Sequence, residues 1–164
     1  NLQWTIKRSD FAPWHPGRCA ELIVDGKAVA HAGEIHPRII AKYGLPERSV
    51  AFAVGLSALP DSEIVRPSRV GTMPAAVQDV ALIVDQSVTA LDVENALRSG
   101  AGDLLESIAL FDRYDKIGDG KISLAFTLTF RAPDRTLTGA EVSAMRESAV
   151  VAAEKATGAV LRTA

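Results

Sequence analysis

The order of strand-like and helix-like patterns in residues 77–164 constrains the fold of this chain most strongly. Runs rich in β-branched and aromatic residues predict four strands, at Val77–Asp85, Leu104–Tyr114, Lys121–Arg131 and Ala159–Thr163. One helix-like segment lies between the first and second strands, and another between the third and fourth. This β-α-β-β-α-β order is typical of a ferredoxin-like α+β sandwich, in which two helices pack on one face of a four-stranded antiparallel sheet.

Capping signals predict where the two helices begin. Thr89 is followed three residues later by Asp92, and Thr138 by Glu141, which is the spacing at which side chains cap a first helical turn. Glycines end the first helix at Gly100–Gly102 and close the second one. The second helix carries a stripe of mostly small residues, which lets it lie close to the sheet: Val142, Met145, Ala149, Ala152 and Ala156.

Alternation within Lys121–Arg131 predicts which sheet face is buried. One parity holds only large apolar residues and should face the helices: Ile122, Leu124, Phe126, Leu128 and Phe130. The other parity is small and polar, from Lys121 through Ser123 to Arg131, and no helix is left to cover it. An exposed polar sheet face suits unstacked nucleic-acid bases or the surface of another protein.

Asp112, Tyr114 and Ser123 are predicted to meet near the end of this hairpin. A ring for stacking, a carboxylate for base amino or imino groups and a small hydroxyl form a base-reading cluster. A hairpin end with solvated polar tips is an equally good interpretation of the spacing alone. Because Ile108 and Leu110 share the phase of Asp112, the cluster also requires a β-bulge or a partly apolar face.

Residues 1–60 predict a separate α+β module of paired strands and one helix. Its expected elements are a strand at Cys19–Val24, a hairpin turn at Asp25-Gly26, a strand at Lys27–Gly33, a helix at His36–Tyr43 and a half-buried strand at Ser49–Leu59. The proline-punctuated residues 61–76 are predicted to be a linker. Residues 77–164 then form the ferredoxin-like domain.

Composition excludes several classes of protein. With 48% apolar residues and a net charge of -2 over 164 residues, the chain is neither disordered nor basic enough to bind nucleic acid through phosphates alone. No apolar run approaches the roughly 18 to 20 residues of a membrane span. The first residues resemble no secretory leader, and the single Cys19 suits a reducing cytosol.

No motif predicts a catalytic or metal site. The loop that begins at Asp115 resembles an EF-hand, but Ile117 and Phe126 occupy positions where calcium needs carboxylates. His15, His31 and His36 match no metal-ligand spacing, so structural roles are favoured for them. Neither a nucleophile elbow nor a P-loop is present.

Several motifs resemble those of a known family. The runs Leu110-Phe-Asp-Arg-Tyr114, Gly120-Lys-Ile-Ser-Leu-Ala-Phe126, Phe130-Arg through Thr138-Gly-Ala-Glu141, and Gly158-Ala-Val-Leu-Arg162 are similar to the ferredoxin-fold anticodon-binding domain of bacterial phenylalanine–tRNA ligase beta subunits. Upstream, His15-Pro-Gly-Arg-Cys-Ala20, Asp25-Gly-Lys27 and Gly33-Glu-Ile-His-Pro37 resemble the end of the catalytic-like, non-catalytic class II synthetase module of that subunit.

The resemblance implies a function for the whole enzyme. Such ligases are cytoplasmic heterotetramers of two alpha and two beta chains that use ATP and Mg²⁺ to join phenylalanine to tRNA-Phe. Catalysis belongs to the alpha subunit, so this fragment is expected to be non-catalytic, to hold no cofactor and to have no membrane or DNA partner. The alternative function is that of a regulatory or protein-interaction ferredoxin-like module without RNA contact.

The resemblance also implies RNA-binding residues. Asp112, Tyr114 and Ser123 match family positions that contact anticodon bases. Lys121 and Arg162 are added to this set because their cations are placed where they could face phosphates.

Overall fold

The computed structural model describes residues 4–59 and 71–162. The chain divides into two compact units, Asn1–Pro67 and Ser68–Ala164. Most of the linker predicted at residues 61–76 lies outside the described residues, and its last residue, Ala76, begins a strand.

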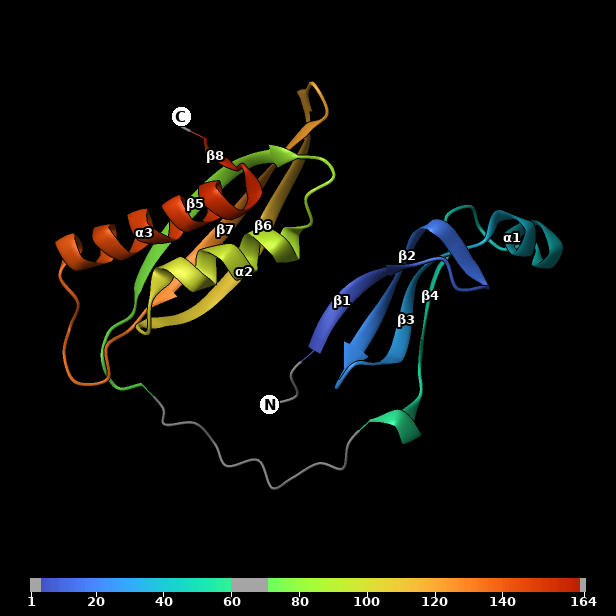
Figure 1. The fold of residues 1–164 in the computed structure, drawn as a ribbon, viewed down its shortest axis with the longest axis horizontal. Coiled ribbons are helices and arrows are strands. Elements are labelled where there is room, and N and C mark those ends of the chain that lie inside the picture. Colours follow the sequence, from blue (N-terminus) through green and yellow to red (C-terminus); the bar gives the residue numbers. More distant parts are fainter. Residues whose placement is uncertain (1–3, 60–70, 163–164) are drawn as a thin grey trace. The chain divides into compact units, whose positions relative to one another are not determined.

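The first unit is an antiparallel sheet with a short helix (Figure 1). Its sheet order is β1-β2-β3-β4. The elements are β1 (Trp4–Ser9), β2 (Trp14–Val24), β3 (Lys27–Ile35), α1 (Pro37–Tyr43), β4 (Val50–Val54) and the 3-10 turn η1 (Leu56–Ala58).

Local signals predicted the β2–β3 turn and α1, whereas β1 was not predicted and β2 begins at Trp14 and not at Cys19. The β2–β3 turn falls at Asp25 and Gly26, with φ of 48° and 75°, so both residues adopt the left-handed region that such a tight turn requires. His36 caps α1, because its Nδ1 accepts a hydrogen bond from the backbone N–H of Arg38 at 3.2 Å. Gly44 ends the helix with a φ of 63°.

The strand predicted at Ser49–Leu59 needs correction. It ends at Val54, where Gly55 leads into η1. The strand is also not half-buried, because Val50 and Phe52 are 74% and 78% exposed. No described element of this unit packs over that side of the sheet, so the alternating apolar residues face outwards.

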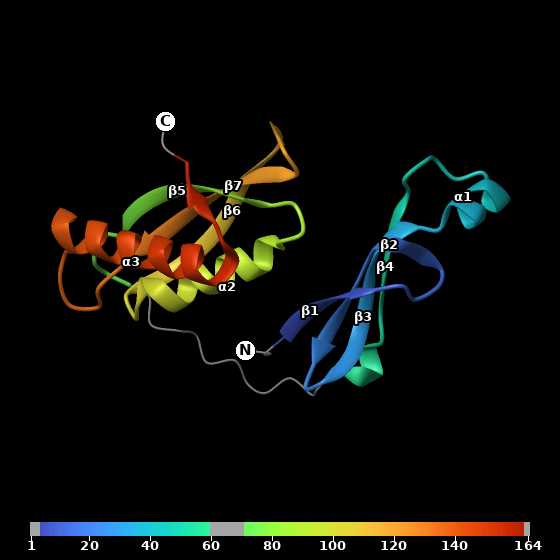
Figure 2. The same cartoon turned by 45° about the horizontal axis from the view of Figure 1, so that its top comes forward.

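The second unit has the predicted ferredoxin-like architecture. Its elements are β5 (Ala76–Asp85), α2 (Ala90–Ala101), β6 (Leu105–Gly118), β7 (Lys121–Phe130), α3 (Gly139–Thr157) and β8 (Val160–Leu161). The antiparallel sheet has the order β6-β7-β5-β8. Both helices lie side by side on one side of the sheet (Figure 2), and both begin at the predicted capping boxes.

The core of this unit lies between the helices and the sheet. All five predicted inward residues of β7 are at most 1% exposed. The stripe predicted on α3 is partly wrong: Val142 and Ala149 are buried, whereas Ala156 is exposed and Val150 and Ala153 are buried in its place. The stripe is rotated because α3 packs against α2 as well as against the sheet.

The β6–β7 hairpin is longer than predicted. β6 continues to Gly118, so the turn consists of Asp119 and Gly120, with φ of 53° and 68°, and not of residues 115–120. Asp115 lies in the strand and pairs with Arg113 at 2.8 Å, and this arrangement leaves no calcium-type loop there.

Candidate functional site

A β-bulge in β6 decides which side chains reach the open sheet face. Leu110 pairs with Phe126, and the next paired residue is Asp112, opposite Ala125. Phe111 is therefore the extra residue of the bulge, and it is 58% exposed. The bulge that the phase of Asp112 required is present, and it turns Asp112 away from the helix side, where Phe126 is buried.

Tyr114 and Ser123 occupy one row of this open face. They pair directly across β6 and β7, and Ile83 of β5 is the neighbour of Ser123 on its other side. Tyr114 is 45% exposed, so its ring is accessible from solvent. Ser123, expected to be an exposed hydroxyl, is only 3% exposed, because it lies in a central strand between two larger side chains.

Asp112 and Arg162 stand at opposite edges of the next row. The backbone N–H of Arg162 donates to the carbonyl oxygen of Ala81 at 2.8 Å, which places Arg162 beside Ala81, and Ala81 pairs with Ala125. Three strand spacings separate Asp112 from Arg162, or about 14 Å. This row thus has a carboxylate at one edge and a guanidinium at the other, with the small side chains of Ala125 and Ala81 between them.

Lys121 lies one row beyond Tyr114, at the hairpin end of β7. Its cross-strand neighbours are Asp85 in β5 and Gly118 in β6. The pKa of Asp85 is lowered mainly by hydrogen bonds from Ser87 and to a smaller degree by Lys121. All five predicted residues therefore share one face by register, but Arg162 is on the far edge from the other four.

Sequence reasoning missed a polar pair on the same face. The Thr127 hydroxyl donates to Asp79 Oδ1 at 2.7 Å, across the β5–β7 ladder. The signal was present in β5, where Asp79 and Ala81 alternate with the buried Val80 and Leu82. The prediction followed the alternation of β7 only and so left the outward residues of β5 unassigned.

Arg131 marks the opposite end of β7. Its Nε donates to both carboxylate oxygens of Glu106, at 3.0 and 3.1 Å, and its Nη1 donates to the carbonyl oxygen of Met73. A groove of about 790 Å³ adjoins this cluster. Because the guanidinium is already engaged by these acceptors, Arg131 ties the residues before β5 to the end of the sheet.

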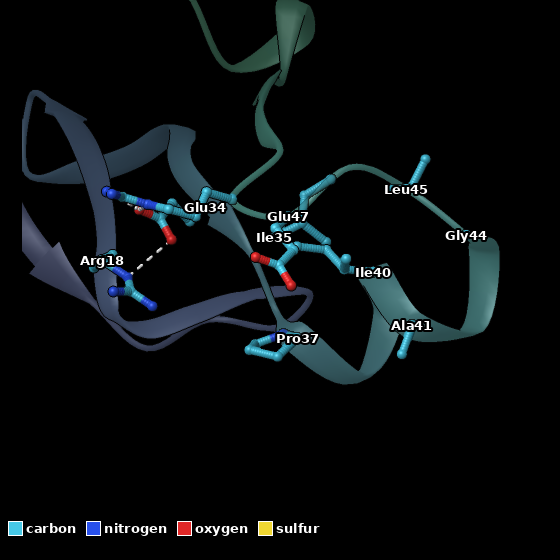
Figure 3. Close-up of a pocket in the computed structure, with 10 residues that line it drawn as sticks. Arg18, Glu34, Ile35, Pro37, Ile40, Ala41, Gly44, Leu45 and Glu47 are labelled. Atoms are coloured by element: carbon cyan, nitrogen blue, oxygen red, sulfur yellow. Dashed lines mark hydrogen bonds and ion pairs between the residues drawn. The ribbon is translucent and has the colours of Figure 1, made fainter.

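The first unit contains a pocket of about 540 Å³ beside α1 (Figure 3). At its edge, Glu34 forms an ion pair with Arg18 Nε at 2.9 Å and accepts a hydrogen bond from Arg48 Nη2 at 2.9 Å. The side chain of Glu34 is 12% exposed. These two ion pairs tie β2, which carries Arg18, and the segment before β4, which carries Arg48, to Glu34 of β3.

The histidines have structural surroundings. His31 is stacked against the rings of Phe11 and Trp14, with centroid distances of 4.5 and 5.5 Å, and His36 caps α1. Within residues 4–59 and 71–162, no group of three or more His, Cys, Asp or Glu side chains is arranged to hold a metal ion. None of the described helices is long and apolar enough to cross a membrane.

Comparison with known families assigns both parts of the chain. Residues 71–162 match the ferredoxin-fold anticodon binding domain. Residues 1–56 match the phenylalanyl tRNA synthetase beta chain CLM domain. The open face described above therefore lies wholly within the first of these two matches.

Individual relatives resemble the chain over nearly its whole length. The phenylalanine–tRNA ligase beta subunit of Corynebacterium jeikeium is 50% identical over 163 residues, which cover 98% of this chain and 19% of that protein. The corresponding subunit of Nocardia farcinica is 54% identical over 154 residues, covering 93% and 18%. That of Mycobacterium leprae is 47% identical over 155 residues, covering 93% and 19%. The chain spans about a fifth of the length of these relatives.

Proposed function

The chain belongs to the ferredoxin-fold anticodon binding domain family, and from this we propose that it is the part of a phenylalanine–tRNA ligase beta subunit that binds the anticodon stem-loop of tRNA-Phe. One observation carries the proposal more than any other. The bulge at Phe111 brings Asp112 and Tyr114 onto a sheet face that neither α2 nor α3 covers.

The chemistry of this face fits unpaired bases. The accessible ring of Tyr114 offers a stacking surface, and each base stacked on an aromatic side chain contributes about 1–3 kcal/mol. Asp112 accepts hydrogen bonds from amino or imino groups on the edge of the base. Ser123 offers a short hydroxyl, which is 3% exposed, so a base reaches it only once the neighbouring ring of Tyr114 turns to stack on that base.

Lys121 and Arg162 supply the phosphate contacts in this proposal. They lie at two margins of the open face, so a loop that crosses the face meets a cation at each end. The whole chain nevertheless carries a net charge of -2. Because most affinity for a phosphate backbone comes from cations, this chain alone binds tRNA weakly, and recognition depends on its base contacts.

The remaining activity is assigned to the complete enzyme. We infer that the relatives' longer chain works with an alpha subunit, as two alpha and two beta chains in the cytoplasm, and uses ATP and Mg²⁺ for aminoacylation. The described residues contain no cluster suited to a metal ion. In this proposal, the part of this chain is to position the tRNA.

The alternative is a protein-docking module. It draws on the exposed apolar side chains around the same face, such as Phe111 and Val160, which are 58% and 57% exposed. The two functions differ in what Tyr114 contacts. An RNA-binding face depends on the ring itself, whereas a protein interface would depend on the apolar rim as a whole.

The test uses the complete ligase with Tyr114→Ala in its beta subunit. We expect a KM for tRNA-Phe about tenfold higher or more, because a stacked base is lost, with unchanged adenylate formation. Tyr43→Ala is the matched control, since Tyr43 lies in the first unit and is 68% exposed. A normal KM for tRNA in the Tyr114→Ala enzyme would refute the proposal.

A further inference from the structure

We propose that Asp79 is a base-selecting residue, which accepts a hydrogen bond from the exocyclic amino group of the nucleotide next to the one in the row of Asp112. The inference rests on the proposed function, because it assumes that RNA crosses this face. It assigns a role to a side chain outside the Asp112–Tyr114–Ser123 cluster.

Asp79 is oriented before any ligand arrives. Its Oδ1 accepts a hydrogen bond from the hydroxyl of Thr127 at 2.7 Å, and this bond is exposed to solvent. An exposed carboxylate normally samples several rotamers, and binding then costs conformational entropy. The cross-strand bond from Thr127 reduces this cost and leaves Oδ2 as an acceptor.

The neighbours of Asp79 leave room for a flat base. On the same face, Ala81 follows Asp79 in β5, and Ala109 of β6 lies opposite Thr127. Short side chains thus lie beside the carboxylate on the side of Ala81 and across the sheet, whereas Val77, which is 56% exposed, flanks it on its other side along β5. A planar ring can rest on the short side chains with its edge towards Asp79.

The spacing of the rows suits consecutive nucleotides. Thr127 is two residues beyond Ala125 in β7, which corresponds to about 6.6–6.8 Å. Stacked nucleotides advance by about 3.4 Å, and unstacked ones extend further. One nucleotide in the row of Asp112 therefore places the next base in the row of Asp79.

Charge decides which part of the nucleotide faces Asp79. A carboxylate repels phosphate and accepts N–H donors, so it selects the base edge. Adenine, cytosine and guanine carry an exocyclic amino group, and uracil does not. The backbone then runs on the side of Arg162, whose row adjoins that of Asp79.

The experiment measures binding of the 164-residue chain to an RNA stem-loop with the anticodon GAA, which pairs with a phenylalanine codon. In matched RNAs, each anticodon adenosine is replaced in turn by purine riboside, which lacks only the amino group. We expect the wild-type chain to bind one of these RNAs about tenfold more weakly, as for the loss of a hydrogen bond to a charged group.

Variants then assign this selectivity. Asp79→Ala should bind the adenosine and purine RNAs equally, and Thr127→Val should show a reduced but measurable difference, because Asp79 keeps its charge but loses its orientation. Glu147→Ala removes the same charge from an exposed position on α3. It should retain the full tenfold selectivity.

Two outcomes would overturn the inference. These are a wild-type chain that does not distinguish the RNAs and an Asp79→Ala variant that keeps the selectivity. If such a variant also binds both RNAs more tightly, Asp79 only repels phosphate. Tyr114→Ala is measured alongside. If Tyr114→Ala binds the unmodified RNA like wild type, the proposed function itself fails. If Tyr114→Ala binds that RNA weakly and one of the outcomes above is observed, only the role of Asp79 is refuted.

Discussion

Tyr114 of β6 lies directly opposite Ser123 of β7, and the pair combines an exposed ring with a buried hydroxyl, at 45% and 3% exposure. Opposed residues of an antiparallel pair have Cβ atoms about 4.5–5.5 Å apart. The size of the residue at position 123 therefore controls the space beside the ring of Tyr114. This relationship makes Ser123 a test of the open face that does not alter the ring itself.

Ser123→Leu should abolish most RNA binding. Because Ser123 is 3% exposed between Tyr114 and Ile83, the larger side chain displaces the ring of Tyr114 and costs about 1–3 kcal/mol in the free energy of unfolding. Ser123→Ala keeps the space and should weaken binding only by the value of one hydrogen bond, about 0.5–1.5 kcal/mol. Titration of the anticodon stem-loop, with circular dichroism as the check on folding, measures both. Wild-type affinity in Ser123→Leu would show that no base occupies this place.

Gly100→Ala should destabilise the second unit. A Cβ at this position would lie 2.5 Å from Ala152 Cβ and 2.6 Å from the carbonyl oxygen of Ser148, so α2 and α3 would have to move apart. We expect a loss of about 1–3 kcal/mol in the free energy of unfolding, measured by urea denaturation.

The matched control for Gly100 is Gly139→Ala in α3. A Cβ at Gly139 meets no heavy atom within 4 Å, so the change is neutral or raises helix stability by up to about 1 kcal/mol. Equal stability changes in the two variants would contradict the close helix crossing at Gly100.

Stability of the second unit should fall as the pH is lowered from about 4.5 towards 2. The pKa of Glu141 is lowered from 4.5 to about 2, first by the hydrogen bond from Arg135 and then by those from the backbone and hydroxyl of Thr138. A carboxyl whose pKa is lower in the folded state stabilises the fold above the unfolded pKa. This contribution is lost as the pH falls through the folded pKa.

In Arg135→Gln, the free energy of unfolding should fall less steeply as the pH is lowered from about 4.5 towards 2. Denaturation by urea at a series of pH values, followed by the helical circular dichroism signal, measures the slope. Lys116→Gln, which removes an equal charge from the exposed hairpin, should leave the slope unchanged. An identical acid limb in Arg135→Gln and wild type would show that the pair with Glu141 does not affect folding.

Phe52→Ser should reduce self-association of the chain without destabilising the first unit. The side chain of Phe52 is 78% exposed, and surface substitutions of this kind usually change stability by less than about 0.5 kcal/mol. An exposed apolar sheet face favours association, so light scattering at high concentration should decrease.

Trp14→Ala provides the contrast in the first unit. Trp14 is 7% exposed, and its Nε1 donates to the carbonyl oxygen of Ala51 at 3.1 Å. Its truncation should cost about 3–5 kcal/mol. A similarly large loss in Phe52→Ser would mean that the outer face of β4 is packed in the isolated chain.

Local sequence signals were sufficient wherever partners lie within a few residues of one another. The capping boxes at Thr89 and Thr138 and the turn at Asp25 and Gly26 formed as predicted. Each capping box depends on groups three residues apart, and the turn depends on two adjacent residues that adopt the left-handed region, so the sequence alone contains the whole interaction.

Signals that depend on the neighbouring strand were less complete. The length of the β6–β7 hairpin was underestimated because the residues from Asp115 to Gly118 resemble a loop in composition, yet pair as strand. The face of α3 was misplaced because its stripe is set by two partners, α2 and the sheet. The spacing of apolar residues along α3 does not show which elements pack against it.

The sequence by itself determined the order of strands and helices in residues 77–164 and the caps of both helices there. It also showed that Asp112 needs either a bulge or a partly apolar face. These features follow from the hydrophobic period and from hydrogen bonds between residues close together in the chain. The tertiary structure alone decided that Phe111 is the bulged residue, that Ser123 lies buried between Tyr114 and Ile83, and that Thr127 orients Asp79. These features arise between residues on different strands, and their geometry exists only once the strands have paired in register.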